Sequence, residues 1–249
     1  NIKKAYHESM GVQVMNIQHG SGYGVRLGFE ASYVYEFSQN IFLTWGWNKY
    51  FDFLKTKFVP LPVPILLKPK RLGYQQKKSD TLLFFDISYN LRSARLDGLH
   101  LPHETLRELN DRQKFFKNLR KNIQKKLVYR PHVFHSNQIN SEQILLNEGL
   151  KFERFKSISL LELTDKILKS KLLVANHFGT TFHYALAWNI PMVSYWEPSH
   201  MEVFEGAEEL FLKLRRAKII FSSYEDAVIH INEVFENIDE WWLSKEVQF

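Results

Sequence analysis

The sequence contains no cysteine, so neither a disulfide framework nor a thiolate metal site can form. It has no run of about 18 apolar residues that would span a bilayer, and residues 1–20 lack the basic, apolar and small-residue order of a signal peptide. The histidines show no short paired spacing with carboxylates, which argues against a metal site. These absences predict a cytoplasmic protein with no metal or other cofactor.

The composition is sufficient for a folded core and gives a basic surface. The 249 residues are 45% hydrophobic and 15% aromatic, enough for one large domain or one domain plus a smaller piece. The net charge is +6, and one basic stretch covers residues 114–126. A solvated helix face is the simplest interpretation of that stretch, and contact with a membrane surface stays open.

Apolar strands alternate with helical stretches from Thr81 onward. Strands are expected at residues 81–87, 127–132, 152–155, 172–175, 192–196 and 218–221, with helices between them. This order predicts an α/β fold with a Rossmann-like, doubly wound parallel sheet. Upstream, strands at 12–17 and 41–47 and a helix at about 49–57 predict a smaller unit. The proline-rich stretch that begins at Val59 predicts an extended connection.

The segment 172–196 reads as a strand, a polar turn, a helix and a second strand. The turn follows the carboxyl end of a buried strand, and the helix after it presents free backbone amides and its positive dipole end. An anion fits such a place. The candidate phosphate-binding residues are Asn176, His177, Gly179, Thr180 and Thr181; simple helix capping by the threonines is the alternative.

A second candidate lies in the glycine-rich turn after the first strand. His19 stands where that strand ends, and its imidazole is a side chain whose proton moves near neutral pH. Gly20 and its neighbouring glycines let a ligand approach the backbone closely. His19 is therefore a candidate general base, with a loop histidine bonded to a backbone carbonyl as the alternative.

Four further side chains follow strands of the larger sheet. Arg130 could pair with a phosphate through two hydrogen bonds, or form a surface ion pair. Glu197 could accept hydrogen bonds from a ribose or sugar hydroxyl. Asp86 and Tyr89 could contact donor or acceptor, or build an Asx-type turn.

Several short motifs together suggest a family. They are Gln18-His19-Gly20-x-Gly22-Tyr23-Gly24, Thr44-Trp45-Gly46-Trp47, Asn189-Ile190-Pro191, Tyr195-Trp196-Glu197-Pro198 and Asp239-Glu240-Trp241-Trp242 with Glu246-Val247-Gln248. From residue 13 to residue 249 the chain resembles a family of transferases from surface-carbohydrate gene clusters. More distantly it looks like the CDP-glycerol glycerophosphotransferases and the two-domain GT-B type glycosyltransferases.

The resemblance implies a division of the chain. Residues 1–58 would be the end or remnant of an N-terminal acceptor lobe, and residues 59–79 a linker. Residues 80–237 would be the Rossmann-like donor-binding lobe, and residues 238–249 a C-terminal helix that packs back on the N-terminal lobe. About 80 residues cannot supply a full N-terminal lobe, so we expect a fragment or a shortened relative.

The resemblance also implies an activity: transfer of a sugar or alditol phosphate from a nucleotide-activated donor to a surface-polysaccharide acceptor, with His19 as the base. The expected partners are the nucleotide-sugar donor and a carbohydrate acceptor, with peripheral contact at the inner membrane face and no nucleic acid. Two alternatives stay open. One is a catalytically incomplete remnant that only binds nucleotide sugars, and the other is a basic protein that binds nucleic acid or a membrane surface.

Overall fold

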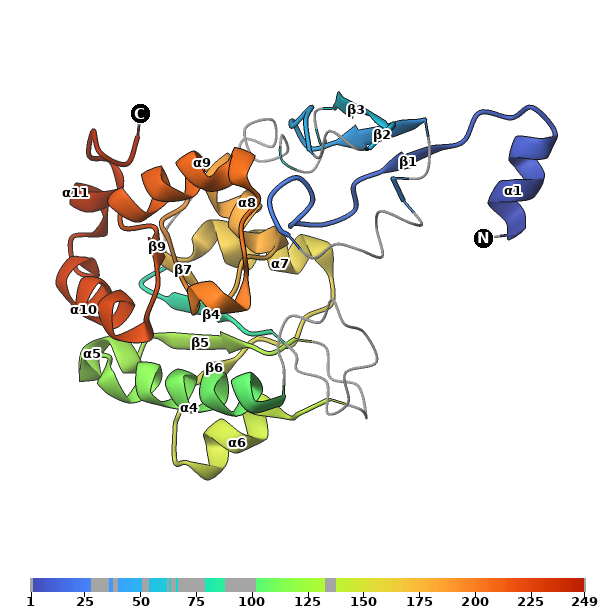
Figure 1. The fold of residues 1–249 in the computed structure, drawn as a ribbon. Coiled ribbons are helices and arrows are strands. Elements are labelled where there is room, and N and C mark those ends of the chain that lie inside the picture. The colour runs from blue at the N-terminus through green and yellow to red at the C-terminus, as the bar shows by residue number, and fades with distance from the viewer. Residues whose placement is uncertain are drawn as a thin grey trace.

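The computed structural model contains a small sheet and a large one, both entirely parallel (Figure 1). It describes residues 2–27, 36–37, 40–50, 54–61, 63, 66, 79–87, 102–132 and 138–248. The N-terminal elements are α1 (Ile2–Ser9), β1 (Met15–Ile17), β2 (Ile41–Thr44) and β3 (Lys57–Pro60). The remaining elements are β4 (Leu82–Phe85), α4 (Pro102–Asn118), α5 (Lys121–Gln124), β5 (Leu127–Arg130), α6 (Ser141–Asn147), β6 (Glu153–Arg154), α7 (Leu160–Lys169), β7 (Leu172–Ala175), α8 (Thr180–Ala187), β8 (Met192–Tyr195), the 3-10 helix η1 (Pro198–His200), α9 (Glu205–Arg216), β9 (Ile220–Phe221), α10 (Tyr224–Val234) and α11 (Ile238–Trp242).

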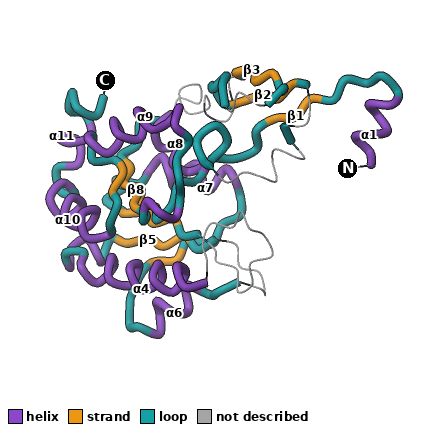
Figure 2. The backbone as a smooth tube through the Cα atoms, viewed as in Figure 1, coloured by secondary structure: helices purple, strands orange, loops and turns teal. Residues whose placement is uncertain are grey.

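The large sheet has the strand order β6-β5-β4-β7-β8-β9, and every neighbouring pair is parallel. This is the Rossmann order, in which the first strand lies at the centre beside the fourth. The predicted α/β fold with a doubly wound parallel sheet is therefore confirmed. Helices cover both faces of the sheet (Figure 2).

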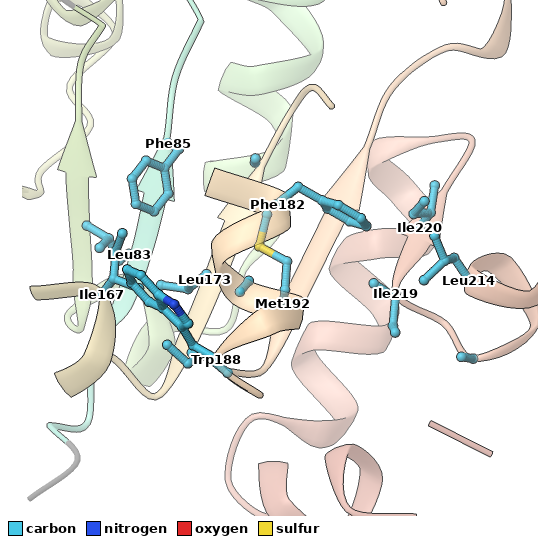
Figure 3. Close-up of a cluster of buried hydrophobic side chains, with 14 of the residues drawn as sticks. Leu83, Phe85, Ile167, Leu173, Phe182, Trp188, Met192, Leu214, Ile219 and Ile220 are labelled. Atoms are coloured by element: carbon cyan, nitrogen blue, oxygen red, sulfur yellow. The ribbon is translucent and has the colours of Figure 1, made fainter. Parts of the chain in front are cut away.

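Alternate residues along each central strand supply the two halves of the core. Leu82 and Phe84 point to the face covered by α4, α5 and α10, where Phe115 packs. Leu83 and Phe85 point to the opposite face, covered by α7, α8, α9 and α11 (Figure 3). Because both faces are buried, the strands read as continuous apolar runs, which is the expected pattern for a parallel sheet.

The small sheet has the order β1-β2-β3 and packs a separate aromatic cluster. Tyr23, Phe37, Phe42 and Tyr50 form the buried part of that cluster, and Phe204 from the loop before α9 packs against it. A helix was predicted at about 49–57, and this is wrong for the residues that the structure describes. Residues 54–56 are loop and 57–60 form β3, whose edge position accommodates Pro60.

The C-terminal segment requires a second correction. The sequence predicts a C-terminal helix that packs back on the N-terminal lobe, but the contacts of α11 lie on the larger lobe. Trp241 donates its indole N–H to the Ala217 carbonyl, and Trp242 donates to Asn189 Oδ1 at 2.9 Å. Both indoles thus satisfy backbone and side-chain acceptors of turns that precede β8 and β9.

Among the described helices, none is long and apolar enough to cross a membrane.

Candidate functional site

The candidate site lies where the chain leaves the central strands β4 and β7. These strands are hydrogen-bonded neighbours, yet α4 after β4 packs on one face of the sheet and α8 after β7 packs on the other. The carboxyl ends of strands at such a switch point are the usual ligand position in open α/β sheets. The predicted turn at 176–179 follows β7 at this edge of the sheet.

The turn after β7 is fixed by buried polar contacts. Asn176 is buried, and its Oδ1 lies 3.3 Å from His177 Nδ1. The Ser194 hydroxyl donates to the His177 carbonyl at 3.3 Å. A Cβ atom on Gly179 would lie 2.6 Å from His177 Nε2, so the glycine makes room for the imidazole ring. Asn176 and Gly179 therefore shape this turn.

His177 is an uncharged imidazole at neutral pH. Burial lowers the pKa of His177 to about 4, and the charges of Arg112 and His132 add to the effect. A histidine with this pKa can donate or accept one hydrogen bond, but it does not bring a positive charge to a phosphate.

The first turn of α8 offers uncapped backbone donors. Gly179 is the N-cap residue and provides no side-chain cap, and the half-buried Thr180 and Thr181 occupy the next two positions. The first amides of a helix lack intrahelical acceptors, and the dipole favours negative charge there. Both hydroxyls and the free amides are therefore suited to an anionic group.

The His19 turn of the small lobe faces this helix end. A Cβ atom on Gly20 would lie 4.0 Å from Thr180 Oγ1. The Trp45 ring also contacts the His183 ring of α8 edge to face, with centroids 5.6 Å apart. The structure thus brings together two turns that are far apart in the sequence.

The His19 imidazole is open to an incoming group, with 71% of its side chain exposed. Its Nδ1 lies 2.9 Å from the Tyr23 hydroxyl and 3.7 Å from Glu36 Oε1. A hydroxyl and a carboxylate beside one imidazole orient the ring, and general-base catalysis requires such a positioned side chain.

Gln18 holds the turn in place, and sequence reasoning missed this residue. Its side-chain carbonyl accepts from the Trp45 amide and the Trp47 indole at 2.9 Å each, and its amide donates to the Gly20 carbonyl at 2.8 Å. The Trp45 indole donates to the Gln18 backbone carbonyl at 3.0 Å. Gln18 belongs to the motif Gln18 to Gly24, and its partners belong to the motif Thr44 to Trp47. Nothing in the sequence indicates that the two motifs are in contact.

Arg130 lies in an adjoining pocket of about 300 Å³ at the ends of β4, β5 and β6. Its guanidinium lies over the Phe85 ring, 5.7 Å from the centroid. No carboxylate in the described ranges forms an ion pair with it, so the surface ion pair considered above is not found there. Burial lowers the pKa of Arg130. A partly buried cation of this kind suits an anionic ligand.

Asp86 borders the same pocket, but its carboxylate is already engaged. Arg112 Nη1 lies 2.6 Å from Asp86 Oδ1, and both side chains are almost fully buried. The Tyr129 hydroxyl and the Ile87 amide also donate to this carboxylate. Burial raises the pKa of Asp86, and the Arg112 charge opposes that rise. These contacts favour a supporting role for Asp86 over direct ligand contact.

Glu197 is likewise paired. Arg107 Nη2 of α4 lies 2.7 Å from Glu197 Oε2, and 60% of the Arg107 side chain is exposed. This exposed ion pair leaves Glu197 able to exchange partners at low cost. Tyr89 lies outside the described residues. Within the described ranges, no group of three histidine or acidic side chains could hold a metal ion.

The fold is similar to that of a solved trehalose-6-phosphate synthase, and other solved structures give lower TM-scores. A trehalose-6-phosphate synthase studied with bisubstrate glycomimetics has a TM-score of 0.50 and 9% identity, over 96% of this chain and 64% of its own. The structure described as trehalose-6-phosphate from E. coli bound with UDP-2-fluoro glucose has a TM-score of 0.43 and 10% identity, over 97% of this chain and 70% of its own. The wall teichoic acid polymerase TagF has a TM-score of 0.41 and 10% identity, over 93% of this chain and 62% of its own.

These identities establish a likeness of fold alone: two parallel sheets that resemble the lobes of GT-B transferases. The chain spans less than two thirds of the trehalose-6-phosphate synthase and TagF chains. No match to a curated protein is found. One protein-family model, described as LIC12162 family transferase, matches residues 1–249.

Proposed function

Since the chain belongs to the LIC12162 family of transferases, we propose that it transfers a sugar, or an alditol phosphate, from a nucleotide-activated donor to a hydroxyl of a surface-polysaccharide acceptor. The observation that carries this proposal is the closeness of the Gly20 turn to α8, where a Cβ atom on Gly20 would lie 4.0 Å from Thr180 Oγ1. This closeness supports a site in which an exposed imidazole works beside a helix end suited to phosphate.

The donor phosphates bind at the start of α8 in this proposal. The amides and hydroxyls of Thr180 and Thr181 replace the water that solvates the diphosphate, and the helix dipole stabilises the charge that grows as the nucleotide leaves. Arg130 in the adjoining pocket neutralises a further negative group of the nucleotide. Glu197 exchanges Arg107 for a donor hydroxyl.

The acceptor hydroxyl is deprotonated by His19. Its oxygen bonds to the transferred carbon or phosphorus atom, the bond to the nucleotide phosphate oxygen breaks, and the nucleotide departs with that electron pair. The imidazole then holds the acceptor proton, and the nearby Glu36 carboxylate stabilises the imidazolium.

The donor half of the proposal is tested by binding of UDP, GDP, CDP and CMP compounds, measured by thermal shift and calorimetry, because a ligand of the native state raises its melting temperature. Replacement of Thr180 and Thr181 by alanine should weaken the best nucleotide about tenfold. Ser223→Ala is the matched control, since it removes the cap of another helix, α10, that also begins after a strand of this sheet. Equal nucleotide affinity in the threonine variant and the control would refute the phosphate assignment.

The catalytic half is tested with His19→Ala. Donor affinity should stay within about twofold, while nucleotide release in the presence of acceptor should fall about 100-fold or more. His7→Ala, an exposed histidine of α1, should leave both unchanged. Full turnover in His19→Ala would refute the base assignment. Donor binding by the wild type without transfer to any acceptor would favour a binding-only protein.

A further inference from the structure

A second pocket, of about 940 Å³, lies between the small sheet and the first turn of α9. Its walls come from the loops that follow β1 and β2 and from the segment that leads into α9. It shares no lining residue with the Arg130 pocket. The lining includes Trp47, Lys49, Tyr50, Phe204, Glu205 and Glu208, and Gly24 lies beneath the Trp47 ring.

Backbone pairing between the two lobes holds the walls of this pocket together. The Phe204 amide donates to the Val25 carbonyl at 2.6 Å, and Arg26 forms an isolated antiparallel bridge with Val203. The Tyr50 hydroxyl donates to the Arg26 carbonyl. These contacts join the loop after β1 to the segment before α9, so the pocket is built by both lobes.

Aromatic rings form the apolar part of the wall. Tyr50 and Phe204 meet edge to face with centroids 4.9 Å apart, and Trp47 lies 5.7 Å from Tyr50. The Trp47 ring covers Gly24, where a Cβ atom would come within 2.5 Å of it. The aromatic face is electron-rich and suits the polarised C–H groups of a sugar ring.

The first turn of α9 supplies the polar part. Phe204 is the N-cap residue and gives no side-chain cap, so the amides of Glu205 and Gly206 have no intrahelical acceptor. The carboxylates of Glu205 and Glu208 are exposed and form no ion pair with a residue in the described ranges. Donors and acceptors thus alternate beside an apolar wall, which is the pattern that a polyhydroxyl ligand satisfies.

The charge of the pocket restricts the ligand further. The carboxylates of Glu205 and Glu208 outnumber the one ammonium group among the lining residues, that of Lys49, so the lining carries a net negative charge that disfavours a phosphate or carboxylate group. A ligand with neutral hydroxyls, or with an amino group, meets no such repulsion. This separates the pocket from the donor site at α8, where the helix end is free of acidic side chains.

The pocket is mechanically linked to the candidate base. Tyr23, next to Gly24, lies 2.9 Å through its hydroxyl from His19 Nδ1. Trp47 donates its indole N–H to the Gln18 side chain at 2.9 Å. A ligand that packs against Trp47 would therefore contact one of the residues whose hydrogen bonds fix the position of the His19 turn.

We propose that the pocket between Trp47 and the first turn of α9 binds the acceptor, and that the acceptor end recognised there is an uncharged or amino-bearing sugar. The assignment as acceptor rests on the function proposed above, whereas the sugar preference of the pocket follows from its own side chains.

The test is saturation-transfer NMR of the full chain with methyl glycosides of glucose, galactose, glucosamine and N-acetylglucosamine, and with glucose 6-phosphate as the anionic probe. At least one methyl glycoside should bind the wild type, and glucose 6-phosphate should not. Glu205→Gln with Glu208→Gln should weaken that glycoside about tenfold. Glu209→Gln is the matched control, because Glu209 is a neighbouring acid on α9 that pairs with Lys213 and lies outside the pocket lining.

A charge-reversal variant, Glu205→Lys with Glu208→Lys, should gain binding of glucose 6-phosphate. The inference is overturned if no methyl glycoside binds the wild type, if the double Gln variant binds it as well as Glu209→Gln does, or if added UDP displaces it. Nucleotide binding, measured on the same samples, should be equal in all of them. Failure of the wild type to bind any nucleotide would refute the donor proposal, whereas loss of glycoside binding alone would refute the pocket assignment.

Discussion

The buried pair of Asp86 and Arg112 gives a stability prediction that can be worked from the structure. The Arg112 side chain is fully buried and that of Asp86 is 3% exposed. Arg112→Met removes the positive partner and leaves a carboxylate in an apolar interior, a change that costs about 3–5 kcal/mol in other proteins. Because Asp86 keeps the Tyr129 hydroxyl and the Ile87 amide as donors, we expect the lower end of that range. The free energy of unfolding should fall by about 3 kcal/mol, which corresponds to a melting temperature lower by about 6–12 °C.

The assay is urea unfolding followed by circular dichroism and tryptophan fluorescence. Arg112→Met should lower the midpoint without changing the slope. Asp86→Asn added to Arg112→Met should recover part of the loss, since the amide keeps the shape but not the charge. Lys117 lies on α4, as Arg112 does, and forms an exposed ion pair with Glu148 at the end of α6. Lys117→Met breaks that pair and should cost about 0–1 kcal/mol.

Burial already raises the pKa of Asp86, and loss of Arg112 removes the opposing charge. In Arg112→Met the folded-state pKa therefore lies above the unfolded value, and the destabilisation should shrink as the pH falls toward about 4. A loss in Arg112→Met no larger than that in Lys117→Met, or no recovery in the double variant, would refute this account of the pair.

Two further variants test buried features of the fold. His230 is buried with no hydrogen-bond partner for either ring nitrogen among the described residues, and its pKa is lowered to about 4, mainly by burial. At His230 the unfolded chain binds a proton between about pH 6.5 and 4 that the native chain does not, so this residue should lower the free energy of unfolding by about 2 kcal/mol from pH 7 to 4.5. His177, whose pKa is also lowered to about 4, adds a fall of its own. His230→Phe should therefore reduce the total fall by about 2 kcal/mol, and His7→Phe should leave it unchanged; equal pH profiles for both would contradict the idea. Gly24→Ala places an alanine at a φ of +72° with its Cβ atom 2.5 Å from the Trp47 ring, so its free energy of unfolding in urea should fall by about 1–3 kcal/mol. In Gly20→Ala the atom nearest to the new Cβ lies at 4.0 Å, and the free energy of unfolding should fall by less than about 1 kcal/mol. A Gly24→Ala variant as stable as Gly20→Ala would show that the Trp47 contact is not tight.

The fold was predictable because its signals are local. Strands such as Leu172–Ala175 are continuous apolar runs, and Ser159 and Ser223 are serine N-caps that begin α7 and α10 between the predicted strands. The element at 57–60 was not predictable, since its strand conformation depends on pairing with β2. The same holds for α11, whose position is set by hydrogen bonds to turns before β8 and β9.

For the candidate site, sequence reasoning identified individual residues and not their partners. His19 and Thr180 each stand out after a strand, but their meeting depends on how the two lobes pack. The engagement of Asp86 with Arg112, and of Glu197 with Arg107, joins β-strand ends to α4 across the sheet. Such ion pairs occupy a side chain that would otherwise be available to a ligand, and no local sequence pattern predicts them.

The sequence by itself determined the parallel α/β architecture, the helix end at Thr180 and the glycine-rich turn at His19, because periodicity, capping and glycine content act over a few residues. Only the tertiary structure decided that this turn faces α8, that Gln18 clamps it through two tryptophans, and that the loops of both lobes enclose a second pocket. Those features arise from contacts between segments distant in the chain, whose free energy depends on shape and desolvation in the packed molecule.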